Sequence, residues 1–254
     1  MLQDLPLGGL IAVVFGATFL VTVGVYLAIM ALAARGRANA FKAFSPGMLP
    51  PMGLLFGLIV GFLAAQIWSD AGRAQDAVDR EASALRSVVL LAEAFPGTTA
   101  RFEALVGRQI RAAADEEWPA MADQRATLTV ISAPLAEALQ LAIGLSPRND
   151  GERTAQRELV DAVQDAFDAR RQRIIVSESG LNWVKWTGVI LVALLTLISI
   201  AFVHSDNRLS AKLALGVFAA AVATSLTLLA AQERPFSGQF AVRPDVLLQV
   251  QPDP

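Results

Sequence analysis

The chain has 254 residues, of which 54% are hydrophobic and only 17% are charged, and its mean hydropathy is +0.49. Soluble domains carry about 25% charged residues, so this balance favours a membrane protein. The formal net charge of −2 argues against a nucleic-acid partner, because binding to phosphates calls for a clustered basic surface. With no Cys and a single His, the chain has no ligands for disulfides, thiolate metal sites or classical zinc sites.

Four stretches contain no Asp, Glu, Lys, Arg or His, and each is long enough to cross a bilayer as one helix. A helix rises about 1.5 Å per residue and the hydrocarbon core is about 30 Å thick, so about 20 apolar residues are required. The alternative is a soluble protein with four fully buried helices, but such a core would need a larger polar shell than this chain offers. The predicted spans are residues 7–34, 48–69, 183–203 and 211–232.

The first span is predicted to be a retained anchor, although Ala31-Leu32-Ala33 has the spacing of a signal-peptide cleavage site. A secretory signal starts with positive charge and has an apolar stretch of about 7 to 15 residues. This chain instead starts with Asp4 and has a much longer apolar stretch. Tryptophan is enriched at lipid headgroups, so the membrane boundaries are expected near Trp68, Trp183 and Trp186.

The positive-inside rule gives two opposing indications of sidedness. More Lys and Arg residues lie on the side of the segment between the second and third spans, including Arg73, Arg80 and Arg173. On the other side they are fewer but denser, in short loops where only Asp206 opposes them. We expect the segment and both termini on the cytoplasmic side of a multi-pass protein, in a bacterial inner membrane.

Residues 70–182 are predicted to form a helical soluble domain between the two pairs of spans, residues 1–69 and 183–232, and residues 233–254 form a tail. Strand signals are lacking, and apolar residues recur three and four apart, as on one face of a helix. Charges between them, including Asp161, Asp165, Asp168, Arg170 and Arg171, are expected to form a solvated face. Helix breaks are expected at Pro96-Gly97, at Trp118-Pro119, near Pro134 and at residues 146–151.

No group of residues in the sequence predicts an enzyme. The carboxylates of Asp115, Glu116 and Glu117 could bind a hard cation, but their spacing is not that of a calcium loop. We favour a helix end followed by a proline turn, with Trp118 packing inward. His204 is a lone residue after the third span, and no nucleophile, base and orienting group can be assembled. We therefore expect no catalytic residues, no cofactor and no metal.

The second span contains two rows of residues at a spacing of four, which places each row along one helix face. Pro50 and Pro51 open this helix, where their missing N–H groups cost least. Small residues allow close contact between helices in lipid, and hydrophobic rings can gate a pore by dewetting. The alternative is that the larger side chains face lipid or the other spans. The glycine row is Gly53, Gly57 and Gly61, and the apolar row is Leu54, Leu58 and Phe62.

Several motifs carry a resemblance to a known family. They are Leu49-Pro50-Pro51 with the run from Gly53 to Trp68, the Glu81-Ala82 and Ala84-Leu85-Arg86 run, Glu117-Trp118-Pro119-Ala120-Met121, and Pro235-Phe236-Ser237-Gly238. Together they resemble the bestrophin-like membrane family, over residues from about 49 to 250. That family has no settled activity, but its distant likeness to the pentameric bestrophin anion channels implies an all-α, bestrophin-like fold. It also implies a homo-oligomer, of five subunits in the bestrophins, that passes chloride or other anions.

Carried over residue by residue, Pro51, Leu54, Gly57 and Leu58 match the Pro-x-x-apolar-x-x-Gly-apolar pattern of the bestrophin pore helix. Leu54 and Leu58 would then lie at the hydrophobic neck. The chain departs from animal bestrophins in having aliphatic neck residues and no acidic calcium-binding run, so the resemblance does not imply calcium gating. The Pro-Phe-x-Gly turn is expected where the tail returns toward the membrane surface, with no assigned role.

Two functions from different classes follow from these observations. The first is an oligomeric, bestrophin-like anion channel in the lipid bilayer. The second is a membrane-anchored scaffold or signalling protein with a helical interaction domain. The uninterrupted helical pattern from Ile67 to Val89 favours the second function mechanically, because a continuous helix transmits movement.

Overall fold

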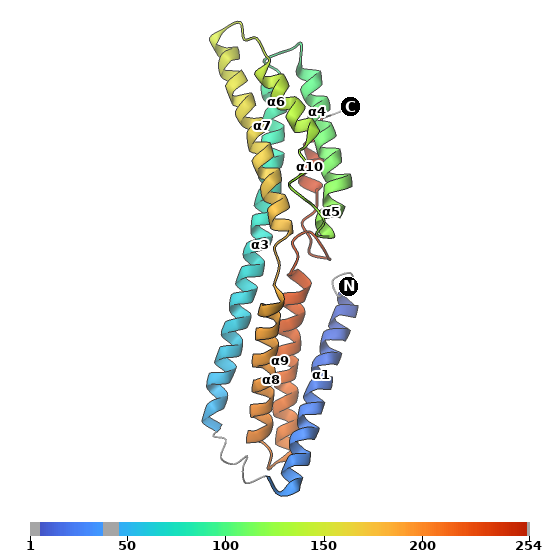
Figure 1. Ribbon diagram of the computed structural model, residues 1–254, viewed down its shortest axis with the longest axis vertical. Coiled ribbons are helices and arrows are strands. Elements are labelled where there is room, and N and C mark those ends of the chain that lie inside the picture. Colours follow the sequence, from blue (N-terminus) through green and yellow to red (C-terminus); the bar gives the residue numbers. More distant parts are fainter. Residues whose placement is uncertain (1–5, 38–45, 253–254) are drawn as a thin grey trace. The chain divides into compact units, whose positions relative to one another are not determined.

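The computed structural model describes residues 6–37 and 46–252, and all regular structure in that part of the chain is helical (Figure 1). Four helices are long and apolar enough to cross a membrane. They are α1 (Leu7–Leu32), α3 (Leu49–Ala92), α8 (Trp183–Val203) and α9 (Arg208–Gln232). The prediction of an all-helical chain with four apolar spans is confirmed. Asp4 and Lys42, which precede two of these spans, lie outside the described residues.

Shorter elements precede or follow the spans. A π-helical turn, η1 (Ala33–Arg37), continues α1, and a 3₁₀ turn, η2 (Pro46–Met48), precedes α3. Between α3 and α8 lie α4 (Thr99–Ala112), the π-helical turn η3 (Ala113–Glu117), α5 (Trp118–Ala122), α6 (Ala133–Ile143) and α7 (Asp150–Ser177). The tail after α9 contains α10 (Asp245–Gln249).

The described chain divides into two compact units. The first unit contains residues 6–37, 46–68 and 180–233, and the second contains residues 69–179 and 234–252. α3 is a single helix of 44 residues that contributes to both units. The predicted continuity of this helix from Ile67 to Val89 is therefore confirmed.

In the first unit, α1 and α3 both pack on the helices of the second predicted pair. α1 packs along α9 and α8, and its Ile29 joins a cluster with Leu197 of α8 and Leu215 of α9. The face of α3 that contains Phe56 and Ile67 lies in another cluster with residues of α8 and α9. The two helices of the first predicted pair are thus joined through the second pair.

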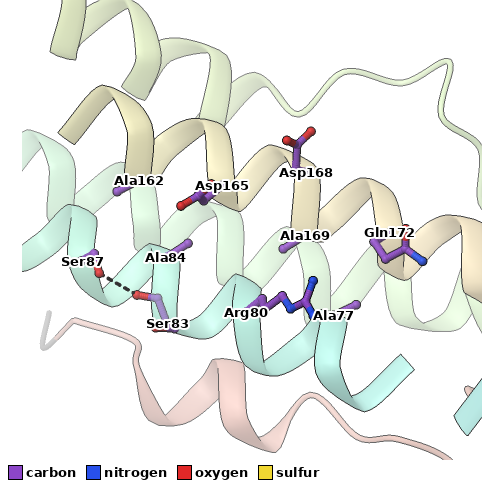
Figure 2. Close-up of a pocket in the computed structure, with 10 residues that line it drawn as sticks. All are labelled: Ala77, Arg80, Ser83, Ala84, Ser87, Ala162, Asp165, Asp168, Ala169 and Gln172. Atoms are coloured by element: carbon purple, nitrogen blue, oxygen red, sulfur yellow. Dashed lines mark hydrogen bonds between the residues drawn. The ribbon is translucent and has the colours of Figure 1, made fainter. Parts of the chain in front are cut away.

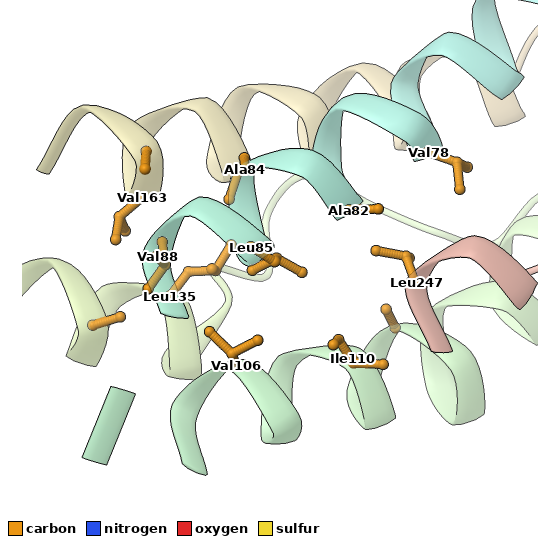
Figure 3. Close-up of a cluster of buried hydrophobic side chains, with 14 of the residues drawn as sticks. Val78, Ala82, Ala84, Leu85, Val88, Val106, Ile110, Leu135, Val163 and Leu247 are labelled. Atoms are coloured by element: carbon orange, nitrogen blue, oxygen red, sulfur yellow. The ribbon is translucent and has the colours of Figure 1, made fainter. Parts of the chain in front are cut away.

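In the second unit, α3, α4, α6 and α7 enclose one hydrophobic core (Figure 3). Each helix contributes fully buried side chains, among them Leu85, Ile110, Leu135 and Val163. These residues belong to the apolar faces expected from the helical spacing, apart from Leu135. Leu247 of α10 is buried in the same core, so the tail packs with this unit.

Three of the four predicted helix breaks separate helices. α3 ends ahead of Pro96-Gly97. α6 begins with Pro134 in its first turn, where the side chain of Ser132 accepts the N–H of Leu135. α7 begins at Asp150, before the end of the predicted break at residues 146–151, and the side chain of Asn149 caps its first turn in the same way.

The predicted helix end at Trp118-Pro119 is wrong. Helical structure continues from Thr99 through η3 to Ala122. A proline in an α-helix lacks the N–H that the helix needs and crowds the preceding turn. The π-helical turn η3 inserts an extra residue just before Pro119, which relieves both problems. Trp118 nevertheless packs inward as expected, with 8% of its surface exposed.

Candidate functional site

Residues 6–37 and 46–252 leave both rows on the second span uncovered. The apolar row is exposed, with Leu54 at 64%, Leu58 at 46% and Phe62 at 72%. A Cβ added at any position of the glycine row would meet no atom within 4 Å beyond its own helix, among the described residues. Pro50 and Pro51 lie in the first turn of α3, as expected. Neither row therefore has a covering neighbour among the residues that the structure describes, and the assignment of both rows remains a prediction.

The apolar row lies opposite the face of α3 that the chain uses for its own packing. At 3.6 residues per turn, the apolar row and the face containing Phe56, Leu63 and Ile67 are about 160° apart around the helix axis. The latter face is buried against α8 and α9. The glycine row lies between the two faces, about 100° from each. α3 is thus held by its own unit on one side only.

Polar side chains of the first unit meet where α3, α8 and α9 approach the unit boundary. The indole Nε1 of Trp68 donates to Gln232 Oε1 at 2.8 Å, and Lys185 Nζ donates to Gln66 Oε1 at 2.6 Å. Trp186 Nε1 donates to Glu233 Oε1 at 3.0 Å. These contacts tie the ends of three spans together at the positions where tryptophan predicted a membrane boundary.

The second unit contains a network of buried ion pairs. Arg173 of α7 is fully buried and donates from Nε to Glu81 Oε2 at 2.7 Å, and from Nη2 to Glu117 Oε2 at 2.7 Å. Glu81 of α3 is also fully buried. Arg170 donates from Nε to Glu117 Oε1 at 2.7 Å and from Nη2 to the carbonyl of Val130 at 3.2 Å. Two arginines and two glutamates thus neutralise one another and join α3, η3 and α7.

Burial disfavours the charged form of Arg173 and would lower its pKa, but the carboxylates of Glu81 and Glu117 outweigh that effect and raise the pKa above its ordinary value. A raised pKa stabilises the fold below the ordinary pKa, and that contribution is lost only as the pH rises through the folded-state pKa. Both pKa values lie far above the physiological range. Arg173 is therefore charged at every physiological pH and adds no pH dependence near neutrality.

Two uncharged side chains extend the network to α4 and α6. Gln109 of α4 is buried, and its Nε2 donates to Glu81 Oε1 at 3.2 Å. Its Oε1 accepts the hydroxyl of Ser132 at 2.5 Å, and Ser132 caps α6. The four helices that enclose the core, α3, α4, α6 and α7, are therefore linked through Glu81, directly or through one intermediary.

Trp118 connects this network to the tail. Its ring lies 4.5 Å from the guanidinium carbon of Arg173 and packs edge-on against Phe236 at 5.7 Å between ring centroids. The indole Nε1 donates to the carbonyl of Val242 at 3.0 Å. Gly238 has a φ of 88°, a left-handed conformation that explains why glycine is found in this turn.

The third and fourth motifs of the family resemblance meet in this cluster, where Trp118 packs on Phe236, which the sequence interpretation did not foresee. Phe236 is buried in the second unit, where its aromatic ring completes the core, and the expected return of this turn toward a membrane surface stays a prediction. The expectation of a solvated Arg170 is wrong, because its side chain is buried between Glu117 and the Val130 carbonyl. Glu117 pairs with both arginines, while Asp115 and Glu116 are exposed, so the acidic run does not converge on one point.

Sequence reasoning missed Arg173, Gln109 and Ser132 as members of a site. A signal for the arginines was present in the spacing of α7. Positions 159, 163, 166, 170 and 173 follow one another at intervals of four and three, and all five are buried. Charged residues on an apolar stripe indicate a buried polar network.

Four apolar spans and a separate unit with a charged core define a polytopic α-helical membrane protein. The chain belongs to the bestrophin-like family, because the family model "Bestrophin-like domain" matches residues 16–247. This match confirms the resemblance inferred from the motifs. No curated protein and no solved structure matches the chain.

Proposed function

We propose that this chain is one subunit of an oligomeric channel that passes chloride or other anions through a pore formed by α3 of each copy. The observation that carries the proposal is the division of α3 into two faces. Its own unit buries the face with Phe56 and Ile67, while the apolar row on the opposite side is exposed and the glycine row beside it meets no other described residue.

In such an assembly, each glycine row contacts a span of the next copy and the apolar rows surround the axis. Glycine permits close approach of helices, which suits a contact between copies in lipid. Rings of Leu54, Leu58 and Phe62 form a hydrophobic constriction that gates by dewetting. The preference for anions rests on the likeness of the family to the bestrophins, since the row contains no charged residue.

The test is anion flux through liposomes that contain the purified full-length protein. We expect flux with the natural chain and a changed flux in Leu54→Ala and Leu58→Ala, because shortening these side chains widens the constriction. Leu213→Ala on α9, where the side chain is 62% exposed, is the matched control and should leave flux unaltered. A pure oligomer that passes no anion, in the natural chain and in both variants, contradicts the proposal.

The second candidate is a membrane-anchored scaffold or signalling protein. The observation in its favour is that α3 is uninterrupted over 44 residues and carries Glu81 of the buried network, so it connects one unit to the other mechanically. Measurement of the particle mass in detergent separates the candidates. A closed ring of about five subunits supports the channel, whereas a monomer or dimer supports the scaffold.

We further propose that the second unit lies on the cytoplasmic side of a bacterial inner membrane. The chain has no Cys, so a single introduced Cys reports its own side of the membrane. Thr154→Cys on α7 is suitable, since this residue is exposed. An impermeant thiol reagent added to intact cells should leave it unlabelled until the membrane is opened, and labelling of intact cells contradicts this orientation.

A further inference from the structure

The four helices that enclose the core of the second unit, α3, α4, α6 and α7, have a definite order around it. α4 packs on α6 and α6 packs on α7. α3 completes the circuit, because Glu81 bonds to Gln109 of α4 on one side and to Arg173 of α7 on the other. The face formed by α3 and α7 is therefore opposite the face formed by α4 and α6.

The α3–α7 face contains a groove of about 560 Å³ lined by one basic and two acidic residues, Arg80, Asp165 and Asp168 (Figure 2). Gln172 and small residues, among them Ala84 and Ala162, line the rest of it. Arg80, Asp165 and Asp168 are exposed, and none of them forms an ion pair or hydrogen bond with another described residue. Three uncompensated charges thus lie along one open groove.

The α4–α6 face has a groove of similar size, about 520 Å³, with the opposite balance of charge. Its charged lining residues are Arg101, Arg108 and Glu137, and Arg108 pairs with Glu137 at 2.5 Å while both side chains remain half exposed. One face therefore offers two acids and one base, and the other offers two bases and one acid.

The spacing along the helices matches as well. On α4 the arginines lie at positions 101, 108 and 111, and on α7 the acids lie at positions 158, 161, 165 and 168. Each series covers about 15 Å of helix, at a rise of about 1.5 Å per residue, and its members share one side of the helix. Rows of opposite charge and equal length on opposite faces can pair in register.

We propose that the α3–α7 face of one copy binds the α4–α6 face of the next copy. Contact between unlike faces is heterologous, so it repeats from copy to copy and closes into a ring when the rotation permits. Two α3–α7 faces brought together would instead oppose acid to acid, and two α4–α6 faces would oppose base to base. This interface deepens the proposed channel, since it rests on the assembly of several copies, and it identifies the charges that fix their order.

Chemical cross-linking in membranes tests this arrangement, because the natural chain has no Cys to interfere. The full-length chain with both Arg108→Cys and Asp165→Cys is treated with a short bismaleimide. We expect a ladder of covalent dimers, trimers and larger species up to the closed ring. Chains with either change alone should remain monomeric, and co-expression of the two single variants should give dimers only.

The matched control combines Arg108→Cys with Gln75→Cys, which is exposed on α3 outside the lining of the groove, and should give no ladder. Efficient dimers from one single variant would overturn the proposal in favour of contact between like faces. An intact oligomer of known mass that yields no cross-link from the Arg108 and Asp165 pair would also overturn it, while leaving the channel standing. A ladder from a protein without anion flux would support the interface and contradict the channel.

Discussion

The two units satisfy their buried polar groups in different ways. In the first unit, the buried hydroxyls of Thr22, Thr196 and Thr227 each donate to the carbonyl four residues earlier in the same helix, at 2.7 to 2.8 Å. In the second unit, the buried side chains of Glu81, Gln109 and Arg173 bond across helices. These buried hydroxyls of the first unit therefore bond locally, whereas the buried polar network of the second unit depends on tertiary contacts.

This difference follows from the surroundings of each unit. A helix in hydrocarbon must satisfy its polar groups internally, and a hydroxyl bonded to its own helix does so wherever that helix packs. A charged side chain has no such local solution and must find its partners on other elements. Removing a buried hydroxyl from the first unit should therefore cost less stability than removing a buried polar group from the second unit.

The largest effect is expected from Arg173→Met. Removing one partner of a buried ion pair leaves the others uncompensated and costs about 3–5 kcal/mol of unfolding free energy. Here Glu81 would stay fully buried without its cation. Unfolding of the full chain in detergent, followed by far-ultraviolet circular dichroism, measures the loss.

Two further variants show whether the loss comes from the buried ion pair itself. Arg125→Ala removes an ion pair with Asp123 whose side chains are 73% and 58% exposed, so its cost should stay below about 1 kcal/mol. Combining Glu81→Leu with Arg173→Met replaces the buried pair by apolar groups and should recover part of the loss. Equal stability of Arg173→Met and Arg125→Ala would show that the network does not stabilise the second unit.

The next effect is expected from Phe236→Ala, which removes a ring that is 4% exposed and packed on Trp118. Truncating a buried Phe costs about 3 kcal/mol or more. The tail should also detach from the core of the second unit. Chymotrypsin should then cleave faster after Leu247, which is fully buried in the natural chain. The control is Phe240→Ala, since Phe240 is 60% exposed and its loss should change neither stability nor that cleavage.

Spans and core stripes were predictable because both are properties of the linear sequence. A charge-free stretch of sufficient length identifies α8 or α9 without reference to any other segment, and a period of three and four residues identifies the buried face of α7. The same holds for the breaks at Pro96-Gly97 and Pro134, where proline and glycine act on their own turn.

The charged core was not predictable in this way, because its pairs join residues far apart. Glu81 and Arg173 are 92 residues apart, and Glu117 and Arg170 are 53 apart. Because charged residues generally face solvent, Arg170 was predicted to be exposed. Its spacing nevertheless places it on the buried face of α7. The expectation that a proline ends a helix likewise failed at Pro119, because a π-helical turn just before it lets the helix continue.

An intermediate effect is expected from Gly238→Ala, at the turn that carries the tail. Gly238 has a φ of 88°, which a residue with a side chain rarely adopts, so the change should cost about 1 kcal/mol or more. Gly72→Ala is the matched control, because Gly72 lies within α3 and an added Cβ would meet nothing within 4 Å. Alanine should stabilise that helix by about 0.5–1 kcal/mol. If both substitutions changed the free energy of unfolding in the same direction, the role assigned to the turn at Gly238 would be contradicted.

The smallest effect is expected from Thr196→Val in α8, and it tests the comparison of the two units directly. The hydroxyl of Thr196 is buried but donates only to the carbonyl of Val192 in its own helix, so valine fills the same space and should cost about 0.6 kcal/mol or less. Ser132→Ala in the second unit removes a hydroxyl that bonds to Gln109 and caps α6, and should cost about 1–3 kcal/mol. Both are measured by the unfolding of the full chain in detergent. A cost for Thr196→Val as large as that for Ser132→Ala would mean that hydroxyls in the spans also support contacts between helices, and the distinction between local and tertiary bonding would fail.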